Sequence, residues 1–226
     1  MPKRVLVVDD EPDILSLIEY NLTKEGFEVV TARNGAEALQ RTADLPDLVM
    51  LDVMMPELDG FETCRRLKAD PRTAHIPVIF LTARSAEVDE IVGLEIGADD
   101  FLHKPISPRK LVARVRALFR RSEQGGEEQE SVIRTRRITL DRSHYSVRVG
   151  GEEVFFPRKE FELLALLIAH PGRVFSREVI LDQVWGTDVV VTDRTIDVHI
   201  RKIREKLGDD AVLIETIKGV GYRFKD

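Results

Sequence analysis

Five polar residues in the first half of the sequence lie at or just beyond the ends of apolar runs. They are Asp9, Asp10, Asp52, Thr82 and Lys104. The runs are short and almost continuously apolar, as expected of parallel strands that are buried on both faces. Because ligands of open α/β sheets lie outside the carboxyl ends of the strands, these five side chains are expected to converge at one edge of a sheet. Such a set could bind a divalent cation and take a phosphoryl group on a carboxylate.

The three carboxylates would repel one another without a cation, and hard oxygen ligands with room for water favour Mg²⁺. Asp10 and Asp52 are expected to bind the ion directly, and Asp9 through water. The backbone carbonyl of Met54 is a further candidate ligand. With its charge screened by the ion and a neighbouring ammonium group, Asp52 could attack a phosphoryl donor. The side chains expected to hold the new phosphate oxygens are Thr82 and Lys104.

Two other interpretations of these residues remain open. Loops are polar, so strand ends of α/β proteins often carry Asp without any function, although this is less convincing when four strand ends contribute. The second alternative is a metal-dependent phosphatase with an aspartyl nucleophile, which commonly has another Asp two residues later as general acid and base. Met54 holds that position here. Hydrolysis of a phosphoaspartate is therefore expected to be slow, which suits a switch better than turnover.

The elements that would position this site alternate between strand and helix throughout residues 1–121. The strands are expected near 4–8, 28–32, 48–51, 77–81 and 100–102, and the helices near 12–25, 35–43, 60–69, 87–96 and 108–120. This alternation predicts an α/β domain with a doubly wound, five-stranded parallel sheet.

Length and composition predict two domains and a linker. The chain has 226 residues, and segment 122–131 has no large apolar residue, so it is expected to be flexible. The formal charge of −6 is unevenly distributed, because residues 1–121 are acidic and residues 132–226 are slightly basic. Any contact with nucleic acid is therefore expected in the second domain. Without an apolar run long enough for a membrane span or a signal-peptide core, we expect a cytoplasmic protein that does not enter a membrane.

The second domain, residues 132–226, has the pattern of an α+β fold. Short strands near 138–140, 145–149 and 153–156 precede three helices near 158–169, 176–185 and 193–207, and a hairpin is expected within 213–224. The last helix has an apolar stripe made by Ile196, Ile200, Ile203 and Leu207. Its other faces are rich in Arg and Lys, which is typical of the recognition helix of a helix-turn-helix domain. A basic helix that only faces solvent is the alternative.

Residues 1–121 resemble the receiver domain of bacterial response regulators, which has a flavodoxin-like, CheY-like fold. The resemblance rests on Val7-Val-Asp-Asp-Glu11, Leu51-Asp-Val-Met-Met-Pro56, Asp59-Gly60, Leu81-Thr-Ala83 and Gly97-Ala-Asp-Asp-Phe-Leu-His-Lys-Pro105. It implies that Asp52 is the phosphoacceptor, that Asp9 and Asp10 form the acidic metal pocket, and that Thr82 and Lys104 sense the phosphate. It also implies a cis Lys104–Pro105 peptide. Phe101 stands where the family has a switch aromatic, although an ordinary core aromatic is an equal alternative.

The resemblance also implies a dimer face on the fourth helix, fifth strand and fifth helix. Its expected residues here are Glu90, Ile91, Leu94, Asp100, Lys110, Ala113 and Arg114, with Asp100 and Arg114 as a charge pair. Related proteins often have a basic residue at position 90 and an acidic one at position 110, so both signs are reversed in this chain. Charge complementarity would survive, and we expect homodimers that clash with common relatives. Solvated charges at both positions are the alternative.

Residues 132–226 resemble the winged-helix output domain of OmpR/PhoB-type regulators, and in particular their phosphate-regulon branch. The matching motifs are Glu160-Phe-Glu-Leu-Leu164, Arg173-Val-Phe-Ser-Arg177, Val184-Trp-Gly186, Asp193-Arg-Thr-Ile-Asp-Val-His-Ile-Arg-Lys-Ile-Arg204 and Thr216-Ile-Lys-Gly-Val-Gly-Tyr-Arg-Phe224. The DNA contacts that this resemblance implies are Arg194, Thr195, Arg201, Lys202, Arg204, Thr216 and Lys218. The candidates for contact with RNA polymerase are Trp185, Val191 and Asp193, although Trp185 is open to interpretation as a core residue.

Together these features predict a sequence-specific transcriptional regulator of a two-component system. A sensor histidine kinase would phosphorylate Asp52, the receiver would dimerise, and the winged helices would bind promoter DNA. We expect no enzymatic activity beyond slow self-dephosphorylation. A phosphatase and a phosphorylation-independent DNA-binding protein are the competing classes.

Overall fold

The protein consists of two compact units, Met1–Gln129 and Glu130–Asp226, and each is considered by itself. The computed structural model describes residues 2–83, 93, 96–124, 131–135, 137–186 and 193–225, without the side chains of 121–124, 193 and 194. Most of the helix expected near 87–96 therefore lies outside the described residues. Within the described part of the chain, no helix is long and apolar enough to span a bilayer.

The first unit contains a five-stranded, fully parallel sheet in the order β2-β1-β3-β4-β5. Its strands are β1 (Arg4–Val8), β2 (Glu28–Ala32), β3 (Leu48–Asp52), β4 (Val78–Thr82) and β5 (Asp100–His103). This order is the flavodoxin-like version of the doubly wound sheet, so the predicted fold class is confirmed. The three middle strands, β1, β3 and β4, are apolar on both faces because helices cover both sides.

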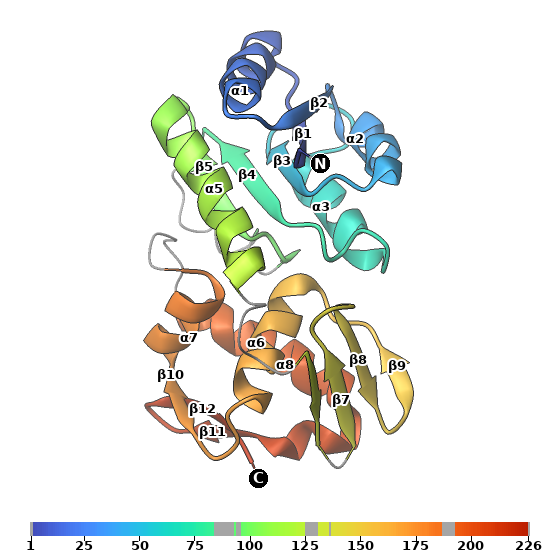
Figure 1. The fold of residues 1–226 in the computed structure, drawn as a ribbon, viewed down its shortest axis with the longest axis vertical. Helices are drawn as coiled ribbons and strands as arrows, with labels where there is room; N and C mark the ends of the chain where they lie inside the picture. The colour runs from blue at the N-terminus through green and yellow to red at the C-terminus, as the bar shows by residue number, and fades with distance from the viewer. Residues whose placement is uncertain are drawn as a thin grey trace. The chain divides into compact units, whose positions relative to one another are not determined.

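Helices pack on both faces of this sheet (Figure 1). They are α1 (Pro12–Lys24), α2 (Gly35–Arg41), α3 (Gly60–Ala69) and α5 (Pro108–Gln124). Helices α1 and α5 bury Leu15, Ile18 and Leu111 against one face, which forms the main core. On the opposite face Phe61 of α3 packs edge-on against Phe80 of β4, with ring centroids 5.2 Å apart.

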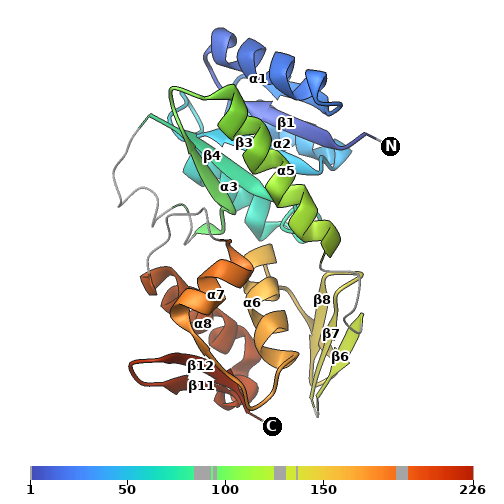
Figure 2. The same cartoon turned by 60° about the vertical axis from the view of Figure 1, so that its left-hand side comes forward.

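The described residues of the second unit form two antiparallel sheets and three α-helices (Figure 2). The four-stranded sheet contains β6 (Val132–Arg134), β7 (Ile138–Asp141), β8 (Ser146–Val149) and β9 (Glu152–Val154). The three-stranded sheet contains β10 (Val174–Ser176), β12 (Gly221–Phe224) and β11 (Ile214–Ile217) in that order. The helices are α6 (Arg158–Ile168), α7 (Arg177–Val184) and α8 (Asp193–Leu207). The predicted stripe of α8 is confirmed, because its four apolar residues are buried.

Two details differ from the sequence-based expectation. Strands β6 and β10 were not predicted, because each has only three residues and depends on pairing with another strand, β6 with the neighbouring β7 and β10 with the distant β12. Helix α5 continues to Gln124, so residues 122–124, the start of the predicted linker, are helical. Ser, Glu and Gln tolerate a helix, whereas the Gly125-Gly126 sequence that follows disfavours one. The flexibility of the remaining linker stays a prediction.

Candidate functional site

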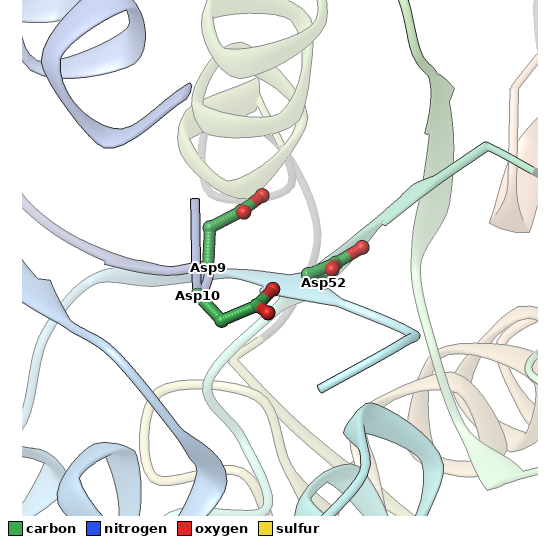
Figure 3. A group of neighbouring side chains, drawn as sticks. All are labelled: Asp9, Asp10 and Asp52. Atoms are coloured by element: carbon green, nitrogen blue, oxygen red, sulfur yellow. The ribbon is translucent and has the colours of Figure 1, made fainter. Parts of the chain in front are cut away.

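Three carboxylates converge at the carboxyl edge of the parallel sheet (Figure 3). Asp9 and Asp10 follow β1, and Asp52 is the last residue of β3. One oxygen atom from each side chain lies within 4.8 Å of the others, and Asp9 and Asp52 are buried whereas Asp10 is exposed. The predicted convergence therefore occurs, and the donor set consists of hard oxygen atoms that fit a divalent cation.

Local backbone geometry holds the carboxylates in place. The Asp9 side chain accepts a hydrogen bond of 3.0 Å from the backbone N–H of Glu11, which turns it back towards the sheet edge. Helix α3 begins directly against the end of β3, because Gly60 has no side chain. A Cβ atom at Gly60 would lie 2.1 Å from the backbone oxygen of Asp52. Only glycine permits this approach, so Gly60 helps to fix the position of Asp52.

Lys104, just after β5, carries the compensating charge of the cluster. Its Nζ lies 2.9 Å from Asp9 Oδ2, 2.9 Å from Glu11 Oε1 and 3.5 Å from Asp52 Oδ2. Its backbone N–H donates to the carbonyl of Thr82, the last residue of β4, at 2.8 Å. The Lys104–Pro105 peptide is cis, as the resemblance implies.

The electrostatics of the cluster leave its carboxylates only partly compensated. Burial, and then the charge of Asp9, raises the pKa of Asp52 to about 6. Burial also raises the pKa of Asp9, against the lowering effect of Lys104. For Lys104 burial favours the neutral amine, but hydrogen bonds to Asp9 and Glu11 and the charge of Asp52 together raise its pKa. One ammonium group therefore does not offset two buried carboxylates and Glu11, which leaves a need for further positive charge.

The remaining receiver residues lie near this edge as expected. Thr82 ends β4 with only 1% of its surface exposed. Phe101 is buried in β5 beside Phe80, with ring centroids 5.4 Å apart, which fits both the switch and the core interpretation. The Met54 side chain is exposed, and its backbone N–H bonds to Asp52.

Part of the proposed dimer face is described. Asp100 and Arg114 form an ion pair of 3.2 Å within the chain. Lys110 and Ala113 are exposed on α5, three residues apart, so they lie on the same side of the helix. The other three residues, Glu90, Ile91 and Leu94, lie outside the described residues.

In the second unit α8 presents basic residues opposite its buried stripe. Arg201 is exposed and pairs with Glu205 at 2.9 Å, and Lys202 is partly exposed. Arg204 faces the C-terminal hairpin, where its guanidinium donates to the backbone oxygen of Ile214 and to the Thr216 hydroxyl, both at 2.8 Å. Arg204 therefore also fastens the hairpin to the helix. Lys218, in the turn of that hairpin, is exposed.

Two residues with a predicted contact role, Thr195 and Trp185, are buried in the interior of the second unit. Thr195 and Trp185 have no exposed surface. Thr195 lies one residue before Ile196 and turns into the core with the helix stripe. Trp185 follows α7 and packs against His199, with ring centroids 5.2 Å apart, which fits the core interpretation. Val191 and the side chains of Asp193 and Arg194 lie outside the described residues.

Sequence reasoning gave no role to several residues that the structure brings into these sites. Glu11 follows the two aspartates directly, and its place in the acidic motif was the available signal. Asp197 bonds to Arg177 and to Tyr222, which lie 20 and 25 positions away. No local pattern connects residues at such separations.

Comparison with known proteins agrees with this geometry. Residues 5–116 match the family of response regulator receiver domains, and residues 151–224 match the family described as transcriptional regulatory protein, C terminal. The phosphate regulon transcriptional regulatory protein PhoB of Rhizobium meliloti is 44% identical, over 100% of both chains. The alkaline phosphatase synthesis transcriptional regulatory protein PhoP of Bacillus subtilis is 40% identical, over 100% of this chain and 98% of that protein.

Solved structures of response regulators are similar as well. A mutant of RitR has a TM-score of 0.78 at 26% identity, covering 99% of both chains. The response regulator DrrB, a Thermotoga maritima OmpR/PhoB homologue, has a TM-score of 0.51 at 33% identity over 100% of both chains.

A receiver sheet with an acidic edge, joined to a winged-helix unit, defines a response regulator. The chain belongs to the OmpR/PhoB-type response regulators, and it is a phosphorylation-dependent, DNA-binding transcriptional regulator. Regulators of this kind are typically not enzymes.

Proposed function

We propose that Asp52 is the phosphoacceptor of this regulator and that a sensor histidine kinase is the donor. The observation that carries the proposal is the position of Asp52, at a strand end, beside Asp9 and Asp10 and within 3.5 Å of the Lys104 ammonium group. An oxygen of the Asp52 carboxylate attacks phosphorus, and the P–N bond of the kinase phosphohistidine breaks. Its electron pair stays on the imidazole nitrogen, which takes a proton, and Asp52 becomes an acyl phosphate.

The residues around Asp52 have separate proposed roles, in binding the metal ion and in binding the phosphate. Mg²⁺, held directly by Asp10, Asp52 and the Met54 carbonyl and through water by Asp9, would neutralise charge on the carboxylate and on the phosphoryl group. Lys104 and the Thr82 hydroxyl hold the phosphate oxygens.

Slow loss of the phosphoryl group follows from the residue two positions after Asp52. The thioether of Met54 cannot transfer a proton, so water is not activated there and the phosphorylated state persists. Any self-dephosphorylation is therefore slow, and the protein is not a phosphatase. Phe101 would follow Thr82 as it moves towards the phosphate, shifting the population between two packings.

The output is a pair of winged helices on promoter DNA. Phosphorylation favours a homodimer through α5 and the neighbouring elements of the receiver, which raises the local concentration of the second units. Arg201 is the foremost candidate for contact with base edges, because it is among the most exposed basic side chains of α8. Lys202 and Lys218 are phosphate contacts, which set affinity more than sequence choice. A contact with RNA polymerase is proposed only near Val191 and Asp193, on the resemblance alone.

Phosphorylation of the full-length protein tests this function. The protein is incubated with Mg²⁺ and acetyl phosphate and followed by intact mass, with Asp52→Asn as control. One added phosphoryl group per chain, absent from the variant, together with more dimer and tighter binding to selected DNA, is the expected result. Sustained release of phosphate would favour a phosphatase. DNA binding without any labelling would favour a phosphorylation-independent regulator.

A further inference from the structure

A single carboxylate on α8 joins three elements of the second unit. Asp197 Oδ1 accepts a hydrogen bond of 2.6 Å from the Tyr222 hydroxyl and another of 2.9 Å from Arg177 Nε. Arg177 Nη2 also donates to the Tyr222 hydroxyl oxygen at 3.3 Å. The first residue of α7, the second turn of α8 and strand β12 of the hairpin therefore meet at one oxygen atom.

This triangle of Asp197, Arg177 and Tyr222 is built around a buried aromatic ring. Tyr222 is buried, and the Arg177 guanidinium carbon lies 5.0 Å from the centre of its ring. Burial, followed by the hydrogen bond to Asp197, raises the pKa of Tyr222 to about 12, so the phenol keeps the proton that it donates. Hydrogen bonds to a charged group are roughly twice as strong as neutral ones, which makes Asp197 the centre of the cluster.

A second link joins the same helix to the same hairpin. Arg204 of α8 donates to Ile214 and Thr216 of β11, as described above. Residues 197 and 204 are seven positions apart, about two helical turns and roughly 10 Å along the axis. Thr216 and Tyr222 lie opposite each other in the β11–β12 pair, so the two links start two turns apart on α8 and meet the hairpin at the same position.

The charge of Asp197 is not explained by DNA binding alone. Its side chain is 48% exposed on a helix that is otherwise rich in basic residues, and a negative charge near DNA phosphates is unfavourable. Simple electrostatics therefore predict tighter binding to DNA when this charge is removed. If Asp197 instead holds the hairpin in place, its removal should weaken binding to a specific DNA site.

We infer that Asp197 is a positioning residue for DNA recognition. It acts through Tyr222 and Arg177, and it keeps the hairpin and the recognition helix in the relative position that matches a specific DNA site. This inference rests on the proposed DNA-binding function, and it adds a residue that the basic pattern of the helix does not reveal.

The test uses the full-length phosphorylated protein and a duplex that the wild-type protein selects from random DNA. Asp197→Asn is expected to lose about tenfold in affinity for this duplex, because the charged hydrogen bonds are weakened. Its affinity for a scrambled duplex stays equal or rises, and the slope of log K against log salt stays unchanged because no phosphate contact is lost. Glu205→Gln is the matched control, since it removes one negative charge from the same helix without touching the hairpin. It should bind both duplexes as tightly as wild type or more tightly.

A double-mutant cycle with Tyr222→Phe separates positioning from general damage. The double variant should lose less affinity for the selected duplex than the sum of the two single losses, because both changes affect the same bond between Asp197 and Tyr222. Thermal unfolding of each variant identifies any that fails to fold. Equal or tighter specific binding by Asp197→Asn, or additive losses in the cycle, would overturn the inference while leaving the DNA-binding function intact. If the wild-type protein enriches no sequence, both proposals are wrong.

Discussion

Only 4% of the Asp52 surface is exposed, and the residue lies beside the buried Asp9. Burial of this carboxylate lowers the free energy of unfolding at neutral pH. Its pKa of about 6 in the folded protein exceeds the ordinary value of 3.8, chiefly because burial disfavours the charged form. Between about pH 4 and pH 6, the Asp52 carboxyl group therefore keeps its proton in the folded protein, whereas it has lost that proton in the unfolded chain. The stability that this group contributes is present below about pH 4 and is lost as the pH rises through about 6.

Replacement of Asp52 by Asn removes this titration. Asp52→Asn should be more stable than wild type by about 1–3 kcal/mol at pH 7.5 in EDTA, with the difference fading towards pH 4. Urea unfolding of both proteins at several pH values measures this difference in the free energy of unfolding. A difference that does not change with pH would show that the substitution acts through packing.

Glu11 competes for the group that is proposed to hold phosphate. Lys104 Nζ lies closer to Glu11 than to Asp52, although the Glu11 side chain is largely exposed. Glu11→Gln should therefore change stability by less than about 1 kcal/mol. It should raise the phosphorylated fraction at limiting acetyl phosphate a few-fold, measured by intact mass, because Lys104 is released from a competing carboxylate. Asp13→Asn removes the same charge two residues later and should have no such effect.

At the level of elements, a buried ion pair connects α3 to the entrance of β5. Lys68 Nζ lies 3.5 Å from Asp99 Oδ2 and donates to the Ile76 carbonyl at 2.7 Å, with both side chains almost fully buried. Asp99 Oδ2 also accepts from the backbone N–H of Val78 at the start of β4. The pair therefore fixes the end of α3 and the starts of β4 and β5 relative to one another, at the edge of the sheet opposite the one that carries Asp52.

Breaking this pair should be far more damaging than breaking a surface pair. Lys68→Met should lower the free energy of unfolding by about 3–5 kcal/mol, because it leaves a buried charge without its partner. Arg66→Met, which removes an exposed pair with Glu62 from the same helix, should cost less than about 1 kcal/mol. Both are measured by urea unfolding. Lys68→Met/Asp99→Asn should recover part of the loss, and a double variant as unstable as the single one would contradict this account.

At the level of the whole molecule, the two units differ in charge and in proposed role. The acidic receiver is proposed to bind the cation and the phosphate, and the basic helix α8 of the second unit is proposed to contact DNA. The proposed homodimer connects these events, and its charge pattern is testable. Lys110 is exposed on α5 beside Ala113, and Glu90 is its predicted partner on the other protomer.

Reversal of one charge should weaken the dimer, and reversal of both should restore it. Lys110→Glu is expected to weaken dimerisation of the phosphorylated protein about tenfold, because like charges then face each other across the interface. Glu90→Lys/Lys110→Glu should dimerise as wild type does. Sedimentation velocity measures both, and Lys24→Glu on α1 is the control for net charge. Unchanged dimerisation in all three variants would rule out this face.

The sheet, the convergence of the strand-end carboxylates and the buried stripe of α8 could all be predicted from the sequence. The carboxyl ends of neighbouring parallel strands lie at the same edge of the sheet, irrespective of the loops that follow them. The positions of Asp9, Asp52 and Lys104 at the ends of apolar runs were therefore sufficient to predict their convergence. The stripe of α8 is equally local, because a helix repeats every 3.6 residues.

Which side chains touch and which are buried depends instead on tertiary packing. Thr195 and Trp185 lie inside, and Lys104 bonds to Glu11, because helix packing sets distances that no periodicity encodes. The meeting of Arg177, Asp197 and Tyr222 depends on where two helices and a hairpin pack against one another. Contacts between residues 20 or more positions apart arise from burial of the shared core, and a local sequence pattern does not carry that information.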